Sequence, residues 1–134
     1  MGTKNSLDIV VDFDGTCVAH EFPKIGHDIG AVPVLKELIS NGHRLILFTM
    51  RSDRITGNFL TDAVDWFKKN DIELYGVQYN PTQHKWTTSN KCDADLYIDD
   101  AALGCPLIKN ENERPFVDWK IVRQLLIDNG IIKL

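Results

Sequence analysis

The sequence predicts a three-layer α/β/α sandwich built around a mostly parallel sheet. Two short apolar runs, residues 7–13 and 43–49, are rich in Ile, Val and Leu, which is typical of strands buried on both faces in parallel sheets. Segments with apolar residues at helical spacing alternate with these runs. Because right-handed crossovers return each helix across the sheet, this alternation favours a Rossmann-like fold with helices on both faces.

The first half of the chain accounts for two strands and two helices. After the strand at 7–13, a helix is expected to stop at Asn41-Gly42, since Gly adopts the left-handed conformation that ends helices. The strand at 43–49 follows. A second helix, at 55–70, has an apolar stripe at positions i, i+3, i+4 and i+7: Leu60, Ala63, Val64 and Phe67.

The second half is expected to complete a single domain spanning residues 1–134. Short strands at 74–78 and 95–98 flank a polar loop, and a closing helix at about 117–129 is expected to end at Gly130. A chain of 134 residues can bury well over half of its unfolded surface around one core, but it has no room for a second full domain. The expected order is β-α-β-α-β-β-α.

Composition excludes several classes of protein. Hydrophobic residues make up 43% of the chain and charged residues 25%, as in packed globular domains. The net charge of -4, without a run of Lys or Arg, argues against binding to duplex nucleic acid or anionic lipid. Without an apolar stretch suited to a signal peptide or membrane span, we expect a cytoplasmic protein with no membrane partner. Cys17, Cys92 and Cys105 lack metal or disulfide spacing and are expected to be free thiols.

Two carboxylates follow the first strand directly, in Asp12-Phe13-Asp14-Gly15-Thr16. Alternation along the strand points both carboxylates in one general direction and Phe13 away from them. Two nearby carboxylates repel each other unless a hard divalent cation lies between them, and Mg²⁺ prefers such oxygen ligands. Gly15 allows an immediate sharp turn. The simpler interpretation is a strand end with an Asp-Gly turn, for which one Asp would suffice.

Polar residues also follow two later strands. Thr49 and Arg51 come after the second strand and can bind phosphate oxygens. Taken alone, Thr49 is more typical of a strand end or helix cap than of a functional residue, and Arg51 is typical of a surface cation. Asp99 and Asp100 follow the strand at 95–98 and add metal ligands at the same sheet edge.

A lysine is the fourth component of this expected site. Lys91, eight positions before Asp99, can neutralise an attacking carboxylate and a transferring phosphoryl group. Lys85 is a competing candidate. Either lysine can also be an ordinary solvated surface residue.

These motifs, strand-DxDGT, strand-Thr, Lys and strand-DD in that order, resemble those of the haloacid dehalogenase-like (HAD) phosphatases over roughly residues 7–108. The phrases AHEFPKIG, LFTMR, NPTQ and YIDDAALGCPL are similar to a group of small bacterial and phage-like hydrolases of that superfamily. One departure is Lys91-Cys92, where family members often have Lys-Pro.

The resemblance implies a magnesium-dependent phosphomonoester hydrolase. Asp12 would attack phosphorus and form a phospho-aspartate, and Asp14 would protonate the leaving group and then activate water. Thr49 and Lys91 would hold the phosphoryl oxygens.

The metal and substrate contacts follow from the same resemblance. Mg²⁺ would join Asp12, the backbone carbonyl of Asp14 and Asp99, while Asp100 would act through water or fix Asp99. Either acid of the DD pair can carry most of the coordination. The expected substrate contacts are Arg51, Gly15 and His20.

HAD-like enzymes usually carry a cap domain, and this chain is expected to lack one. Residues 17–31 hold only a short flap, and little more than one strand and a loop separates the helix at 55–70 from Lys91. An uncovered crevice would admit the end of a phosphorylated macromolecule, whereas a second subunit acting as lid would suit a phosphorylated small molecule. His20, Glu21, Trp86 and the loop at 80–90 are the expected rim, unless they are plain loop surface.

Two other classes of protein stay open at this stage. Response-regulator receivers also combine acids, Mg²⁺, a hydroxyl group and a lysine on a doubly wound sheet, but they carry paired acids first and the phosphoacceptor later. A catalytically silent HAD-like binding module typically loses an acid of the first motif, and this chain keeps both Asp12 and Asp14. Either water or an alcohol can accept the phosphoryl group, so phosphotransferase activity stays open beside hydrolysis.

Overall fold

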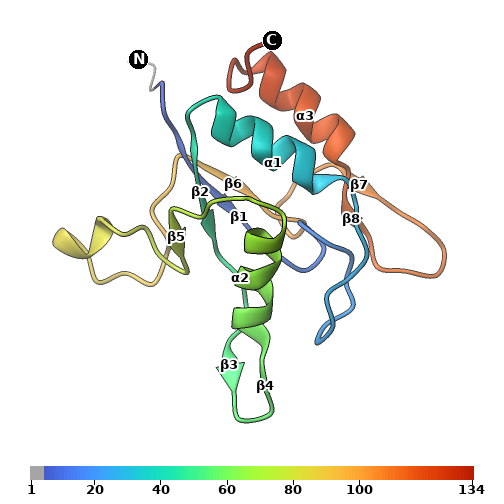
Figure 1. The fold of residues 1–134 in the computed structure, drawn as a ribbon. Coiled ribbons are helices and arrows are strands. Elements are labelled where there is room, and N and C mark those ends of the chain that lie inside the picture. The colour runs from blue at the N-terminus through green and yellow to red at the C-terminus, as the bar shows by residue number, and fades with distance from the viewer. Residues whose placement is uncertain (1–4) are drawn as a thin grey trace.

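The computed structural model describes residues 5–134 and has a mixed α/β fold (Figure 1). Its parallel sheet has the strand order β5-β2-β1-β6, with β1 at Asp8–Val11, β2 at Arg44–Leu47, β5 at Gly76–Val77 and β6 at Leu96–Ile98. The helices are α1 at Ala31–Ser40, α2 at Phe59–Lys69 and α3 at Trp119–Asp128. This sheet and these helices are compatible with a Rossmann-like arrangement and confirm the predicted order β-α-β-α-β-β-α.

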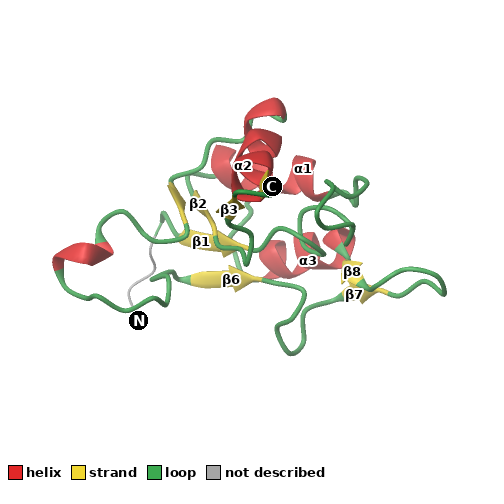
Figure 2. Ribbon diagram, turned by 90° about the horizontal axis from the view of Figure 1, so that it is seen from below, coloured by secondary structure: helices red, strands yellow, loops and turns green. Residues whose placement is uncertain are grey.

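Two antiparallel hairpins and a short 3-10 helix complete the fold. The hairpins are β3 (Asp53–Arg54) with β4 (Gly57–Asn58), and β7 (Leu107–Ile108) with β8 (Phe116–Val117); the 3-10 helix η1 is at Gln83–Lys85. The first hairpin extends from the start of α2, and η1 projects away from the three helices (Figures 1 and 2). The hairpins were not predicted, because strands of two residues carry no measurable periodicity.

The register of the sheet brings three strand ends to one level. Val11 at the end of β1 pairs with Leu47 of β2 and with Ile98 of β6. Asp12 N–H then donates to the carbonyl of Ile98 at 3.1 Å, which extends the alignment by one residue. The residues that follow these three strands therefore lie at a common sheet edge, as parallel pairing requires.

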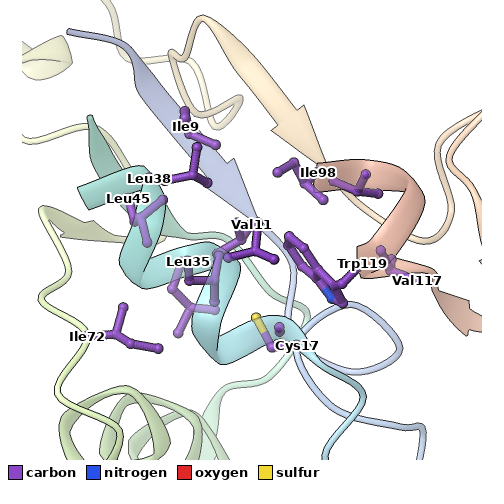
Figure 3. Close-up of a cluster of buried hydrophobic side chains, with 14 of the residues drawn as sticks. Ile9, Val11, Cys17, Leu35, Leu38, Leu45, Ile72, Ile98, Val117 and Trp119 are labelled. Atoms are coloured by element: carbon purple, nitrogen blue, oxygen red, sulfur yellow. The ribbon is translucent and has the colours of Figure 1, made fainter. Parts of the chain in front are cut away.

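The buried side chains form two clusters, one on each face of the sheet. Ile9 and Val11 point into the larger cluster (Figure 3). This cluster also contains buried side chains of all three helices. Those helical side chains include Leu35 and Leu38 of α1, Ala63 and Phe67 of α2, and Val122 and Leu126 of α3. Val10 and Ile46 point to the opposite face, into a small cluster with Cys92.

Among residues 5–134, the expected second layer of helices is not observed, so the three-layer arrangement is not confirmed. The strand order runs β1, β2, β5 and then returns past β1 to β6. A right-handed crossover puts that returning connection on the face opposite the helices. The connection, residues 78–95, contains only η1, because it is polar and has no helical periodicity.

The predicted helix ends are confirmed. Asn41 ends α1 and Gly42 follows with a φ of 89°, while Gly130 follows α3 with a φ of 72°. The second helix starts later than predicted because β3 and β4 occupy residues 53–58. No helix in the described part of the chain is long and apolar enough to cross a membrane.

Candidate active site

A cleft with a volume of about 590 Å³ lies at the carboxyl ends of the parallel strands. Four aspartates, one threonine and two arginines contribute to its lining, together with one histidine and three less polar residues. The lining residues are Asp12, Asp14, His20, Phe22, Thr49, Met50, Arg51, Asp99, Asp100, Ala101 and Arg114. The structure therefore brings most of the predicted site residues together, at the predicted edge of the sheet.

Three carboxylates form the centre of the cleft. Asp12, Asp99 and Asp100 each offer an oxygen atom within 4.8 Å of the others. Burial, followed by the charge of Asp99, raises the pKa of Asp12 to about 8, and burial also raises the pKa of Asp99. Crowded carboxylates of this kind are stabilised either by protons or by a cation. This all-oxygen donor set fits a hard divalent ion such as Mg²⁺.

Thr16 and His20 hold Asp100 in place. The Thr16 hydroxyl lies 3.1 Å from Asp12 Oδ2 and 3.4 Å from Asp100 Oδ1, and it accepts a 3.0 Å hydrogen bond from the backbone N–H of Asp100. His20 Nε2 lies 2.7 Å from Asp100 Oδ2. Trp119 anchors Thr16 in turn, since its indole N–H donates to the Thr16 carbonyl at 2.7 Å. Asp100 is thus oriented by its neighbours.

Gly15 makes this packing possible. Its φ is 82°, and a Cβ atom here would lie 2.0 Å from His20 Nε2 and 2.4 Å from Asp100 Oδ2. Gly15 is buried and does not line the cleft. The expected role of Gly15 as a substrate contact is therefore not supported. The absence of a side chain at Gly15 instead leaves room for the contact between His20 and Asp100.

Asp14 and Arg51 form a buried ion pair beside the three carboxylates. Arg51 Nε and Nη2 donate to the two oxygens of Asp14, each at 2.8 Å, and the arginine is only 2% exposed. The side chain of Asp14 is therefore not part of the cluster of Asp12, Asp99 and Asp100. The ion pair with Arg51 involves only this side chain, so it does not bear on the expectation that the backbone carbonyl of Asp14 binds the metal. Arg51 is likewise a partner of Asp14 rather than the free substrate-binding cation that was expected.

Thr49 lies at the cleft, as predicted. Its backbone N–H donates to Gln78 Oε1 at 2.8 Å, and Gln78 Nε2 donates back to its carbonyl at 2.7 Å. The Thr49 hydroxyl oxygen accepts from the backbone N–H of Arg51 at 3.1 Å. The hydroxyl proton remains able to donate into the cleft.

Lys91 does not line the cleft, in contrast to its expected role in holding the phosphoryl oxygens. It is exposed and lines a separate hollow that includes Trp86 and Tyr97. The surrounding loop is tied to the start of β1, because Asn80 Nδ2 donates to Asp8 Oδ2 at 2.9 Å. Strand β6 lies between Lys91 and Asp99, so the lysine precedes the strand at its amino end, whereas the cleft is at its carboxyl end.

The competing lysine does not replace it. Lys85 is exposed within η1 and is absent from the lining of the cleft. Trp86, which was expected on the rim, also belongs to the separate hollow. His20 does line the cleft, as expected.

Two residues of this region were not predicted from the sequence, Thr16 and Arg114. Thr16 was part of the DxDGT motif, and its position between two acids could have been inferred from the turn at Gly15. Arg114 lies in the β7–β8 connection, where no motif or periodicity marked it.

Fold and site together define an α/β protein with an acidic cleft at the carboxyl ends of a parallel sheet. No family model and no curated protein sequence matches the chain. A solved structure of a conserved protein from Bacteroides thetaiotaomicron is 36% identical, with 93% of each chain covered and a TM-score of 0.74. The chain belongs to the same family as this Bacteroides protein.

Proposed function

We propose that the chain is a magnesium-dependent phosphohydrolase of the HAD-like type, with Asp12 as its nucleophile. The observation that carries the proposal is the cluster of Asp12, Asp99 and Asp100, with a fourth acid, Asp14, two residues beyond the first. The order of these acids along the chain, DxD first and DD last, also matches the HAD-like pattern rather than that of receiver domains.

Mg²⁺ would be held by Asp12, Asp99 and Asp100, and it would neutralise charge on the phosphoryl group during transfer. The raised pKa of Asp12 supports this assignment, because it indicates a carboxylate cluster that needs a compensating positive charge. The Thr16 hydroxyl, which lies between Asp12 and Asp100, and His20 Nε2 fix the orientation of Asp100.

The protein's own groups would carry both chemical steps. An oxygen of Asp12 attacks phosphorus, the bond from phosphorus to the leaving oxygen breaks, and Asp14 gives a proton to that oxygen. In the second step Asp14 takes a proton from water, the water oxygen attacks the same phosphorus, and the Asp12 carboxylate is released. The hydrogen bonds from Arg51 hold Asp14 for both steps, and the Thr49 hydroxyl donates to a phosphoryl oxygen.

We propose that the enzyme lacks a cap domain. The segments that would carry one are residues 17–31, which form a short flap leading into α1, and the stretch between α2 and Lys91, which holds only β5 and η1. Phe22 of the flap and Met50 are 56% and 97% exposed at the cleft, which leaves an accessible apolar rim. Such a cleft suits a small phosphate ester or the phosphorylated end of a macromolecule.

The test is Mg²⁺-dependent hydrolysis of p-nitrophenyl phosphate by the wild-type chain and by Asp12→Asn. We expect turnover by the wild type, loss of turnover on removal of Mg²⁺, and none by the variant. Asp93→Asn is a matched control, because Asp93 is an exposed acid in the loop at the opposite end of the sheet. Undiminished hydrolysis by Asp12→Asn would reject the nucleophile assignment.

A further inference from the structure

We propose that Arg114 is the cation that holds the phosphoryl group of the substrate, which is the role expected for Lys91. The inference rests on the proposed function. Its basis is the juxtaposition of Arg114 with Asp12, Asp99 and Asp100 along one cleft. Lys91 is excluded from that cleft by its place before β6.

The charges lining the cleft leave one cation available. Arg51 Nε and Nη2 donate to Asp14, and His20 Nε2 contacts Asp100. Within residues 5–134 no ion pair or hydrogen bond engages the guanidinium of Arg114. Arg114 therefore keeps its donors for an incoming anion.

Two anchors hold the segment that carries Arg114. On one side, Glu113 Oε2 lies 3.0 Å from His27 Nε2, and Glu113 Oε1 accepts from Asn110 Nδ2 at 2.9 Å. On the other side, Val117 N–H donates to the carbonyl of Gly15 at 2.9 Å. The β7–β8 connection is thus tied to the flap and to the DxDGT turn, and Arg114, on this otherwise exposed loop, lines the cleft.

This chemistry gives the phosphoryl group of a phosphomonoester a cationic partner in an otherwise acidic cleft. The four aspartates of the cleft repel an anion, and a bound divalent ion offsets only part of their charge. A guanidinium offers paired, planar donors that match two phosphate oxygens at once.

The experiment compares Arg114→Ala, Arg114→Lys and Lys91→Ala with the wild-type chain, all loaded with Mg²⁺. Binding of inorganic phosphate is measured by calorimetry, and kcat and KM are measured with p-nitrophenyl phosphate. Charge-assisted hydrogen bonds contribute about 1.5–3 kcal/mol, so Arg114→Ala should weaken phosphate binding by roughly 10-fold to 160-fold. Arg114→Lys should recover part of this loss, and Lys91→Ala should bind as the wild type does.

Mg²⁺ affinity and the circular dichroism spectrum should be unchanged in Arg114→Ala, because Arg114 is exposed and touches no carboxylate of the cluster. The inference would be overturned if Arg114→Ala bound phosphate as tightly as wild type, or if only Lys91→Ala lost affinity. In either case, hydrolysis by the wild-type chain would still support the proposed function. Phosphate binding that depends on Arg114 in a chain without turnover would support the inference and reject the proposed function. Absence of phosphate binding by the wild type would overturn the inference.

Discussion

Arg51 donates two hydrogen bonds of 2.8 Å to the two carboxylate oxygens of Asp14. Its remaining donors reach backbone carbonyls of the flap, Pro23 at 3.4 Å and Lys24 at 2.8 Å, and that of Phe59 at 3.2 Å where α2 begins. One buried cation thus connects the proposed acid, the flap and a helix. Arg51 is a positioning residue, because it acts on the site through Asp14.

Removing this cation should destabilise the fold. Arg51→Ala leaves Asp14 without its partner in a largely buried setting, which typically costs about 3–5 kcal/mol. Urea denaturation should report a loss of this order, whereas Arg54→Ala, an exposed arginine on β3, should stay within about 0.5 kcal/mol of wild type. Equal stability of the two variants would contradict the account of Arg51.

The role of Asp14 is tested by separating turnover from metal binding. Asp14→Asn keeps the size of the side chain but cannot exchange a proton, so kcat should fall roughly 10²–10⁴-fold. Mg²⁺ affinity should change little, because the Asp14 side chain lies outside the cluster of three carboxylates. Normal steady-state turnover, or loss of Mg²⁺ binding, would be incompatible with this role.

The pKa of Asp12 makes the stability of the metal-free protein depend on pH. This pKa is raised on folding from 3.8 to about 8, so the folded chain binds the proton more tightly than the unfolded chain. The stability contributed by that proton is present below pH 3.8 and is lost as the pH rises through about 8. In EDTA, the free energy of unfolding should therefore fall over this range more steeply in wild type than in Asp12→Asn.

Added Mg²⁺ should reverse the trend, because the ion stabilises the carboxylate form that alkaline pH produces. The measurement is urea denaturation at several pH values with and without Mg²⁺. Parallel pH profiles for wild type and Asp12→Asn in EDTA would show that Asp12 does not titrate in this way.

Gly15→Ala tests the close packing of the DxDGT turn. A Cβ at this position meets His20 and Asp100, both side chains being within 2.4 Å, and the residue also has a positive φ. Gly104→Ala is a matched control, since Gly104 has a φ of 86° and nothing within 4 Å of the added atom. Both variants should lose about 1–2 kcal/mol from backbone strain, but Gly15→Ala should lose more and should bind Mg²⁺ more weakly.

Local sequence pattern was enough to predict the main strands and the residues at their ends. The apolar runs around β1 and β2 are buried as expected, and parallel register then brings Asp12, Thr49 and Asp99 to one edge. This part was predictable because it depends on a period of two and on strand direction alone.

Residues whose roles depend on tertiary contacts were harder to predict. The sequence spacing of Lys91 suited the motif, but it did not reveal that the loop before β6 places the lysine in a separate hollow with Trp86 and Tyr97, outside the cleft. Burial of Arg51 depends on the flap folding over it, and Arg114 reaches the cleft only because Glu113 and Val117 anchor its loop. Long-range contacts of this kind leave no periodic signal in the sequence.

The most direct test of the central claim is to trap the covalent intermediate. The Mg²⁺-loaded chain is mixed with p-nitrophenyl phosphate, quenched in acid, reduced with borohydride and mapped by mass spectrometry, which converts a phospho-aspartate into homoserine. We expect homoserine at position 12 of the wild type and none in Asp12→Asn. Reduction at another aspartate, or wild-type turnover without any modified residue, would contradict the assignment of Asp12 as the nucleophile.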